Sequence, residues 1–167
     1  MSFSLLPKLM ADALTDIHPD VFVKHGIRLV MLDFDNTIVP YTTDEPTTLM
    51  LSWLAWVKDC GIYVCVVSNS KRDRVKKFCK KYGLNCITHA KKPFSKGIRA
   101  CMERFACKPE ECALVGDQIF TDTLGANCCG VTSILVRAID NHNIWLKLRH
   151  VAELPFIFLA RKRRISK

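Results

Sequence analysis

The chain of 167 residues contains no apolar run of the roughly 18 to 20 residues that a membrane-spanning helix needs. It also lacks a basic start followed by a long apolar stretch, so we expect no secretory signal. Its nine cysteines are odd in number and never spaced as Cys-x-x-Cys, which argues against a disulfide framework and against a zinc site. We therefore expect small buried thiols and a cytoplasmic protein.

Acidic residues are scarce: the chain has 16 of them and 25 lysines and arginines, which gives a net charge of +9. One basic cluster runs from Lys71 to Lys81, and a second comprises Arg161 to Arg164 with Lys167. This balance favours anionic partners such as phosphorylated substrates, acidic lipid or nucleic acid. The first cluster also fits a solvated helix face. The second directly follows the apolar segment Leu154 to Ala160, which predicts either peripheral contact with an anionic membrane or a packed end with a solvated basic tail.

Strand and helix patterns alternate along the chain, which predicts an α/β fold with a mainly parallel, five-stranded sheet between helices. With 49% hydrophobic residues, we expect one domain over residues 1–167, with its motif-bearing core at about 27–137. The expected strands cover residues 27–34, 63–67, 85–88, 112–115 and 131–137. The expected helices cover residues 47–60, 72–82, 95–105 and 121–129, and a further helix should end at Ile17.

The strongest functional signal lies at the end of the first expected strand. Four apolar residues, Leu29 to Leu32, lead directly to Asp33 and Asp35, and Thr37 follows two positions later. Side chains alternate along a strand, so extended backbone would place both carboxylates on one face. Two neighbouring carboxylates repel unless a cation or a proton is shared between them. The pattern therefore predicts a divalent metal site.

More polar residues follow the later strands. Ser68 and Asn69 end the second, the pair Lys91 and Lys92 follows the third, and Asp117 and Asp122 follow the fourth. Ligands of open α/β sheets bind at the carboxyl ends of the strands, so we expect these residues to gather at one edge. A carboxylate nucleophile, an acid/base carboxylate, hydroxyls, a cation and metal ligands together favour phosphoryl transfer.

In order and position, these groups resemble motifs I to IV of the haloacid dehalogenase (HAD) superfamily. The resemblance implies a Rossmann-like HAD phosphatase. Asp33 would attack phosphorus, Asp35 would act as acid and base and reach the metal through its main-chain carbonyl, and Lys92 would neutralise charge. Thr37, Ser68 and Asn69 would contact the phosphoryl group or substrate, whereas Asp117 and Asp122 would hold Mg²⁺. Lys91 remains an alternative to Lys92, and Asp122 also fits an acid at a helix N-terminus.

HAD enzymes commonly carry a cap domain, but the segments Pro40 to Tyr63 and Ser70 to Lys91 are too short to hold one. An open site suits a large or surface-bound phosphoester. The N-terminal segment, with Leu5-Leu6-Pro7 and His18-Pro19, is similar to the YqeG-type capless phosphatases, which are related to mitochondrial and plant phosphatidylglycerophosphatases. This resemblance implies phosphatidylglycerophosphate as the substrate and a place in phospholipid biosynthesis.

Two other functions fit the same sequence. A phosphatase of a soluble sugar, nucleotide or phosphoprotein would use every one of these catalytic residues. Alternatively, a nucleic-acid-binding accessory protein would grip phosphates with the Lys71 to Lys81 cluster. Only Phe78 and Tyr82 offer stacking surfaces there, which disfavours base recognition. The sequence leaves the oligomeric state open.

Overall fold

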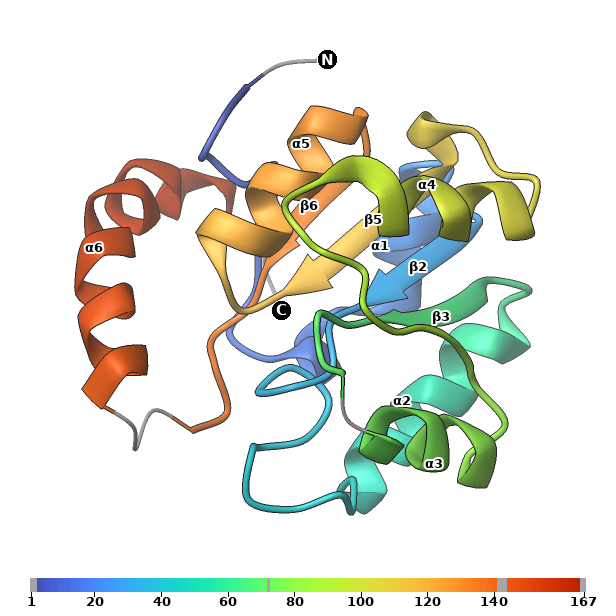
Figure 1. Cartoon of the computed structure of the whole chain (residues 1–167). Coiled ribbons are helices and arrows are strands. Elements are labelled where there is room, and N and C mark those ends of the chain that lie inside the picture. Colours follow the sequence, from blue (N-terminus) through green and yellow to red (C-terminus); the bar gives the residue numbers. More distant parts are fainter. Residues whose placement is uncertain (1–2, 72, 141–143, 166–167) are drawn as a thin grey trace.

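The centre of the protein is a parallel sheet of six strands in the order β1-β6-β5-β2-β3-β4 (Figure 1). The structure is a computed structural model that describes residues 3–71, 73–140 and 144–165, without the side chains of 144–150. The strands are β1 (Leu9–Met10), β2 (Leu29–Leu32), β3 (Tyr63–Val67), β4 (Asn85–Ile87), β5 (Cys112–Gly116) and β6 (Thr132–Leu135). All five strand pairs are parallel, so β2, β3 and β5 end at the same edge.

Helices cover both faces of this sheet. One layer contains α1 (Pro19–Lys24), α2 (Thr48–Asp59) and α3 (Asp73–Lys81), and the other contains α4 (Ser95–Arg104) and α5 (Leu124–Cys129) (Figure 1). Alternation along β2 sends Val30 and Leu32 into the core of the first layer and Leu29 and Met31 into that of the second. This is the predicted three-layer α/β fold.

The last helix, α6 (Ile144–Ala160), lies beside the β1 and β6 end of the sheet, outside both layers (Figure 1). A separate apolar cluster joins it to the body of the protein through Met10, Ile119, Leu135 and Ala160. After it, the chain returns to β1, where the Ile165 amide donates to the Met10 carbonyl at 2.8 Å. None of the described helices combines the length and the apolar character needed to cross a bilayer.

Two details of the predicted fold were wrong. The sheet has six strands rather than five, and the helix expected to end at Ile17 is replaced by β1 and a 3-10 turn at Leu14–Asp16. Leu9 and Met10 pair with Ile134 and Leu135, and so cover an edge of β6 that would otherwise be unpaired. The predicted helix over 72–82 is confirmed as α3, although Arg72 lies outside the described residues, as does Lys167.

The segments that would carry a cap are as small as predicted. The segment between the ends of β2 and β3 contains only α2 as regular structure, and that between β3 and Lys92 contains α3 and β4. Among the described residues, neither segment therefore holds a cap domain. Six of the nine cysteines pack in the core as expected, Cys79 in the first layer and Cys65, Cys101, Cys107, Cys112 and Cys129 in the second, and all nine are free thiols.

Candidate active site

Asp33 directly follows β2 at the carboxyl edge of the sheet. Its amide donates to the Val115 carbonyl of β5 at 2.9 Å, so hydrogen bonding to the neighbouring strand holds the residue in place. The chain then turns sharply, with Asn36 at φ 63° and an isolated bridge between Asp35 and Val39. The parallel register thus brings the predicted site residues at the ends of β2, β3 and β5 to a common edge.

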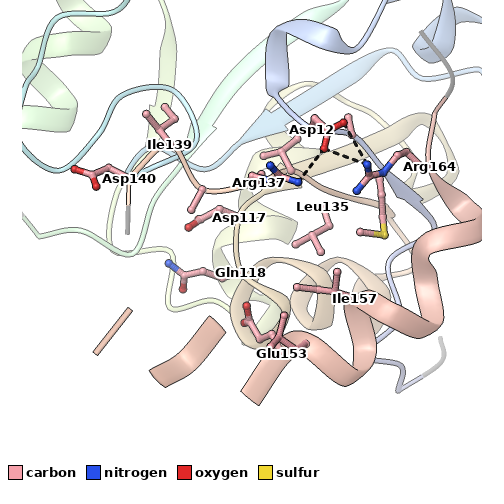
Figure 2. Close-up of a pocket in the computed structure, with 15 residues that line it drawn as sticks. Asp12, Asp117, Gln118, Leu135, Arg137, Ile139, Asp140, Glu153, Ile157 and Arg164 are labelled. Carbon is pink, nitrogen blue, oxygen red and sulfur yellow. Dashed lines mark hydrogen bonds and ion pairs between the residues drawn. The ribbon is translucent and has the colours of Figure 1, made fainter. Parts of the chain in front are cut away.

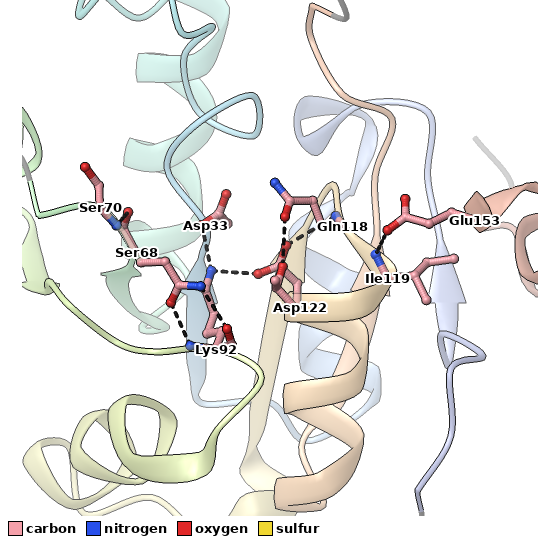
Figure 3. Close-up of polar contacts among 10 residues, drawn as sticks. Asp33, Ser68, Ser70, Lys92, Gln118, Ile119, Asp122 and Glu153 are labelled. Atoms are coloured by element: carbon pink, nitrogen blue, oxygen red, sulfur yellow. Dashed lines mark hydrogen bonds and ion pairs between the residues drawn. The ribbon is translucent and has the colours of Figure 1, made fainter. Parts of the chain in front are cut away.

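Lys92 is the cation at the centre of this edge. Its ammonium lies 2.6 Å from Asp33 Oδ1 and 2.6 Å from Asp122 Oδ1 (Figure 3). Burial alone would lower the pKa of Lys92, but the charges of Asp122 and Asp33 outweigh it and raise that pKa. Lys91 is exposed, so of the two lysines left open by the sequence only Lys92 reaches the carboxylates.

Asn69 fixes the main chain of Lys92. Its Oδ1 accepts from the Lys92 amide at 2.6 Å, and its Nδ2 donates to the Lys92 carbonyl at 2.9 Å. Both ends of the amide are therefore used within the protein. Contact between Asn69 and substrate stays a prediction, whereas its hold on the lysine is a feature of the fold.

Three carboxylates converge beside Lys92. Oxygen atoms of Asp33, Asp117 and Asp122 all lie within 4.8 Å of one another. Burial raises the pKa of Asp33 to about 7, with Lys92 opposing the shift, and burial together with the charges of Asp33 and Asp122 raises the pKa of Asp117 to about 8. Asp117 Oδ1 is buried without a hydrogen-bond partner among the described residues. This buried all-oxygen group fits a hard divalent cation.

The orientation of Asp122 depends on two neighbours. Its Oδ2 accepts from the Gln118 amide at 3.2 Å (Figure 3). A Cβ on Gly116 would lie 2.4 Å from the same oxygen, so only glycine fits at the end of β5. Asp122 belongs to a π-helical turn, Ile119–Thr123, that precedes α5. The predicted helix over 121–129 therefore begins in a wider turn than expected.

An open cleft of about 420 Å³ lies over these groups. Ser68, at the end of β3, is buried on its wall, and its Oγ accepts from the Ser70 amide at 3.0 Å. Thr37 is buried in the turn after Asp35 and does not line the cleft. The described residues that line it are Asp33, Asp35, Tyr41, Ser68, Asn69, Ser70, Lys92, Gln118 and Thr121.

Sequence reasoning missed Arg74. It belongs to the cluster interpreted as a solvated face of α3, yet its side chain is only 12% exposed and forms an ion pair with Asp35 at 3.1 Å and with Asp44 at 2.6 Å. It also donates to the carbonyls of Thr43 and Pro40 in the loop after Asp35, at 2.9 and 3.4 Å. Nothing in a run of basic residues distinguishes the one that turns inward, so only the structure identifies it.

Comparison with known proteins gives the family of the chain. A family model described as "Mitochondrial PGP phosphatase" matches residues 2–139. The chain belongs to that family. It is also 33% identical over 131 residues to a Bacillus subtilis (strain 168) protein named "Probable phosphatase YqeG", covering 78% of this chain and 76% of that protein.

Solved structures share the fold. The cobalt-bound deoxy-D-mannose-octulosonate 8-phosphate phosphatase of Haemophilus influenzae superposes with a TM-score of 0.54 and 11% identity, over 83% of this chain and 92% of that one. A hypothetical protein of Xanthomonas campestris superposes with a TM-score of 0.57 and 18% identity, over 89% and 80%. Together with the family match, the capless HAD fold identifies the chain as a HAD-type phosphatase, an enzyme that acts on phosphomonoesters.

Proposed function

We propose that this phosphatase hydrolyses phosphatidylglycerophosphate to phosphatidylglycerol, through an aspartyl-phosphate on Asp33 and with Mg²⁺ as its metal. The observation that supports this chemistry is the contact between Asp33 and the buried Lys92, beside the carboxylates of Asp117 and Asp122. The family match supports the substrate. The proposal covers residues 1–167 as one catalytic domain.

In the first step, an Asp33 oxygen attacks phosphorus and the bond from phosphorus to the ester oxygen breaks. Asp35, which lines the same cleft, gives its proton to the departing alcohol oxygen. In the second step, water attacks the aspartyl-phosphate, Asp35 takes up the water proton, and inorganic phosphate leaves. Asp33 is thereby restored, and Asp35 is protonated for the next cycle.

Other residues stabilise charge during both steps. Lys92 neutralises the negative charge on Asp33 and on the phosphoryl oxygens, and Ser68 donates its hydroxyl to one of those oxygens. Thr37 is buried in the turn after Asp35, and its hydroxyl has no hydrogen-bond partner among the described residues. Arg74 holds the Asp35 carboxylate and the loop beside it. Arg74 is a positioning residue, because it acts through Asp35.

The metal would bind to Asp33, Asp117 and Asp122, with the Asp35 main-chain carbonyl as a further ligand. Mg²⁺ prefers such oxygen ligands and retains water and substrate oxygens in its shell. When bound, it supplies positive charge that keeps Asp33 ionised and offsets the charge of the phosphoryl group.

The surface of α6 supports a lipid substrate. Between residues 151 and 160 every exposed side chain is apolar, and the exposed residues that follow are all basic. An apolar helix face beside cations suits the interface of an anionic membrane, where each basic side chain contributes about 1 kcal/mol. The exposed apolar residues are Val151, Ala152, Leu154, Pro155, Phe158 and Leu159, and the basic ones are Arg161, Lys162, Arg163 and Arg164.

The deciding experiment measures phosphate release with Mg²⁺ from phosphatidylglycerophosphate in mixed micelles, beside a panel of soluble sugar, nucleotide and protein phosphates. We expect a kcat/KM for the lipid at least about a hundredfold above that for any soluble ester. The Asp33→Asn variant gives the background. Turnover confined to soluble esters would reject the lipid and leave the mechanism in place.

A further inference from the structure

A second cavity, of about 580 Å³, lies on the same sheet edge as the catalytic cleft (Figure 2). It is bounded by residues at or just after the ends of β1, β5 and β6, by one side of α6 and by Arg164. Its volume falls within the range of about 300 to 1,000 Å³ that small-molecule sites occupy. The mechanism described above uses none of its walls except Asp117.

This cavity adjoins the reacting groups. Gln118 lines both spaces, and Asp117, which belongs to the carboxylate group, lines the cavity. A phosphoryl group held at Asp33 would therefore have this cavity beside it. Because the described segments that could carry a cap hold none, the alcohol part of a substrate can contact this neighbouring surface.

The far end of the cavity carries two arginines. Arg137 and Arg164 both contact Asp12, at 3.4 and 3.3 Å, so two positive charges face one negative charge (Figure 2). Their side chains are 70% and 46% exposed, respectively, and most of their N–H donors remain available to a ligand. Guanidinium groups bind phosphate oxygens in pairs, so this end suits a second phosphate.

Between the two charged ends the wall is largely apolar, although the acidic residues Asp140 and Glu153 also line the cavity. Leu135, Leu154 and Ile157 line it, together with Met10. The apolar part of this wall suits the carbon atoms of a glycerol ester. Glu153 holds the wall in place, since its Oε1 accepts from the Ile119 amide at 2.8 Å (Figure 3).

We propose that this cavity binds the leaving alcohol of the substrate, and that Arg137 and Arg164 select alcohols carrying a second, diesterified phosphate. This inference deepens the proposed function and rests on it. A substrate of this class has a terminal phosphomonoester for Asp33, a glycerol linker for the apolar wall and a phosphodiester for the arginines.

The test compares two soluble substrates with the same terminal group. Glycerophosphoglycerophosphate, the deacylated form of the lipid, carries the second phosphate, and glycerol 3-phosphate does not. We expect wild type to favour the former at least about tenfold in kcat/KM. Arg137→Gln and Arg164→Gln should each reduce this ratio at least about threefold, and together they should abolish it. Lys8→Gln, an exposed cation outside the cavity, should keep the ratio.

Three results would overturn the inference: no preference in wild type, a preference that survives the double variant, or a parallel loss on both substrates. The last would mean that the arginines only support the fold. Arg137→Lys with Arg164→Lys keeps the charges and should retain most of the preference, which separates charge from misfolding. If the arginine-dependent preference holds but intact phosphatidylglycerophosphate is not hydrolysed, the cavity inference stands and the lipid substrate is rejected.

Discussion

The catalytic cleft and the cavity beneath α6 share a sheet edge but hold their charges differently. In the cleft, Lys92, Asp33 and Asp122 are buried, and the lysine contacts both acids at 2.6 Å. In the cavity, Asp12 and Arg137 are 40% and 70% exposed, and their contact is 3.4 Å long. Breaking a buried pair costs several kcal/mol, whereas an exposed pair contributes at most about 1 kcal/mol.

This difference in burial suits the cleft to catalysis and the cavity to substrate selection. Buried pairs hold one geometry, as a reacting centre needs, because leaving either partner alone is costly. An exposed pair exchanges one partner for another at little cost, so the arginines can turn from Asp12 to an incoming phosphate. Loss of the nucleophile or of its cation in the cleft should therefore affect all substrates alike, whereas changes in the cavity should affect only those with the matching alcohol.

Asp33→Asn should have the largest effect. It removes the nucleophile while keeping size and shape, so we expect kcat to fall at least about 10³-fold on every substrate. Phosphate release and thermal unfolding, measured on the same preparation, check this. An active variant with an unchanged melting temperature would contradict the role assigned to Asp33.

Lys92→Met should reduce kcat about 10²- to 10³-fold, because it leaves Asp33 and Asp122 without their shared cation. Lys91→Met is the matched control, since Lys91 is the adjacent residue and is exposed. Steady-state kinetics should show wild-type activity for the control. Equal losses in both variants would show that the difference in burial between the two lysines does not matter.

Arg74→Met should slow poor leaving groups more than good ones. The variant removes the ion pair that positions the Asp35 side chain. Proton donation from Asp35 matters most when the alcohol is a poor leaving group. We expect kcat to fall about tenfold on glycerol phosphates and less than about twofold on p-nitrophenyl phosphate. Lys77→Met, an exposed change on the same helix, is the control. Equal losses on both substrates would indicate that Arg74 only supports the fold.

The metal-free protein should lose stability as pH rises. Burial raises the pKa of Asp33 to about 7 and of Asp117 to about 8, from 3.8, so the folded state holds protons that the unfolded state releases. The free energy of unfolding should therefore fall between about pH 4 and pH 8. Calorimetry in chelator should show a lower melting temperature at about pH 8 than at pH 5, and Mg²⁺ should reverse this. A melting temperature that increases over this range would contradict the assigned shifts.

Phe158→Asp should have the smallest effect. The side chain is 61% exposed on α6 and contacts Arg161 through its ring face at 4.1 Å. If this face meets the membrane, binding to anionic liposomes should weaken severalfold at low salt while turnover of soluble esters stays unchanged. Val23→Asp, an exposed change on α1, is the control. Equal sedimentation of both variants with wild type would reject the membrane contact.

The main layers and most of the candidate site could be predicted from sequence. Apolar runs that end in polar residues mark buried parallel strands and their carboxyl ends, and the fold then brings Asp33, Ser68, Lys92 and Asp117 together. The pairing of β1 with β6 could not be predicted. β1 is only two residues long and forms by pairing with β6, and a local pattern does not reveal that partner.

Arg74 and the second cavity escaped prediction for a related reason. Whether a basic residue faces water or an acid depends on packing around it, and its neighbours in the sequence have the same composition. The cavity walls come from five separate stretches of the chain, so no spacing in the sequence marks them.

The Glu153 contact shows that residues supporting the active site extend beyond the matched family region. The family match stops at residue 139, yet a carboxylate 14 positions later secures the amide at the start of the turn that carries Asp122. A chain cut after residue 140 would leave that amide open to water and would uncover Met10, Ile119 and Leu135. The region matched by the family model therefore ends before the last residues that support the active site. A protein shortened to that region would keep the motifs but lose the Glu153 contact and the packing of α6.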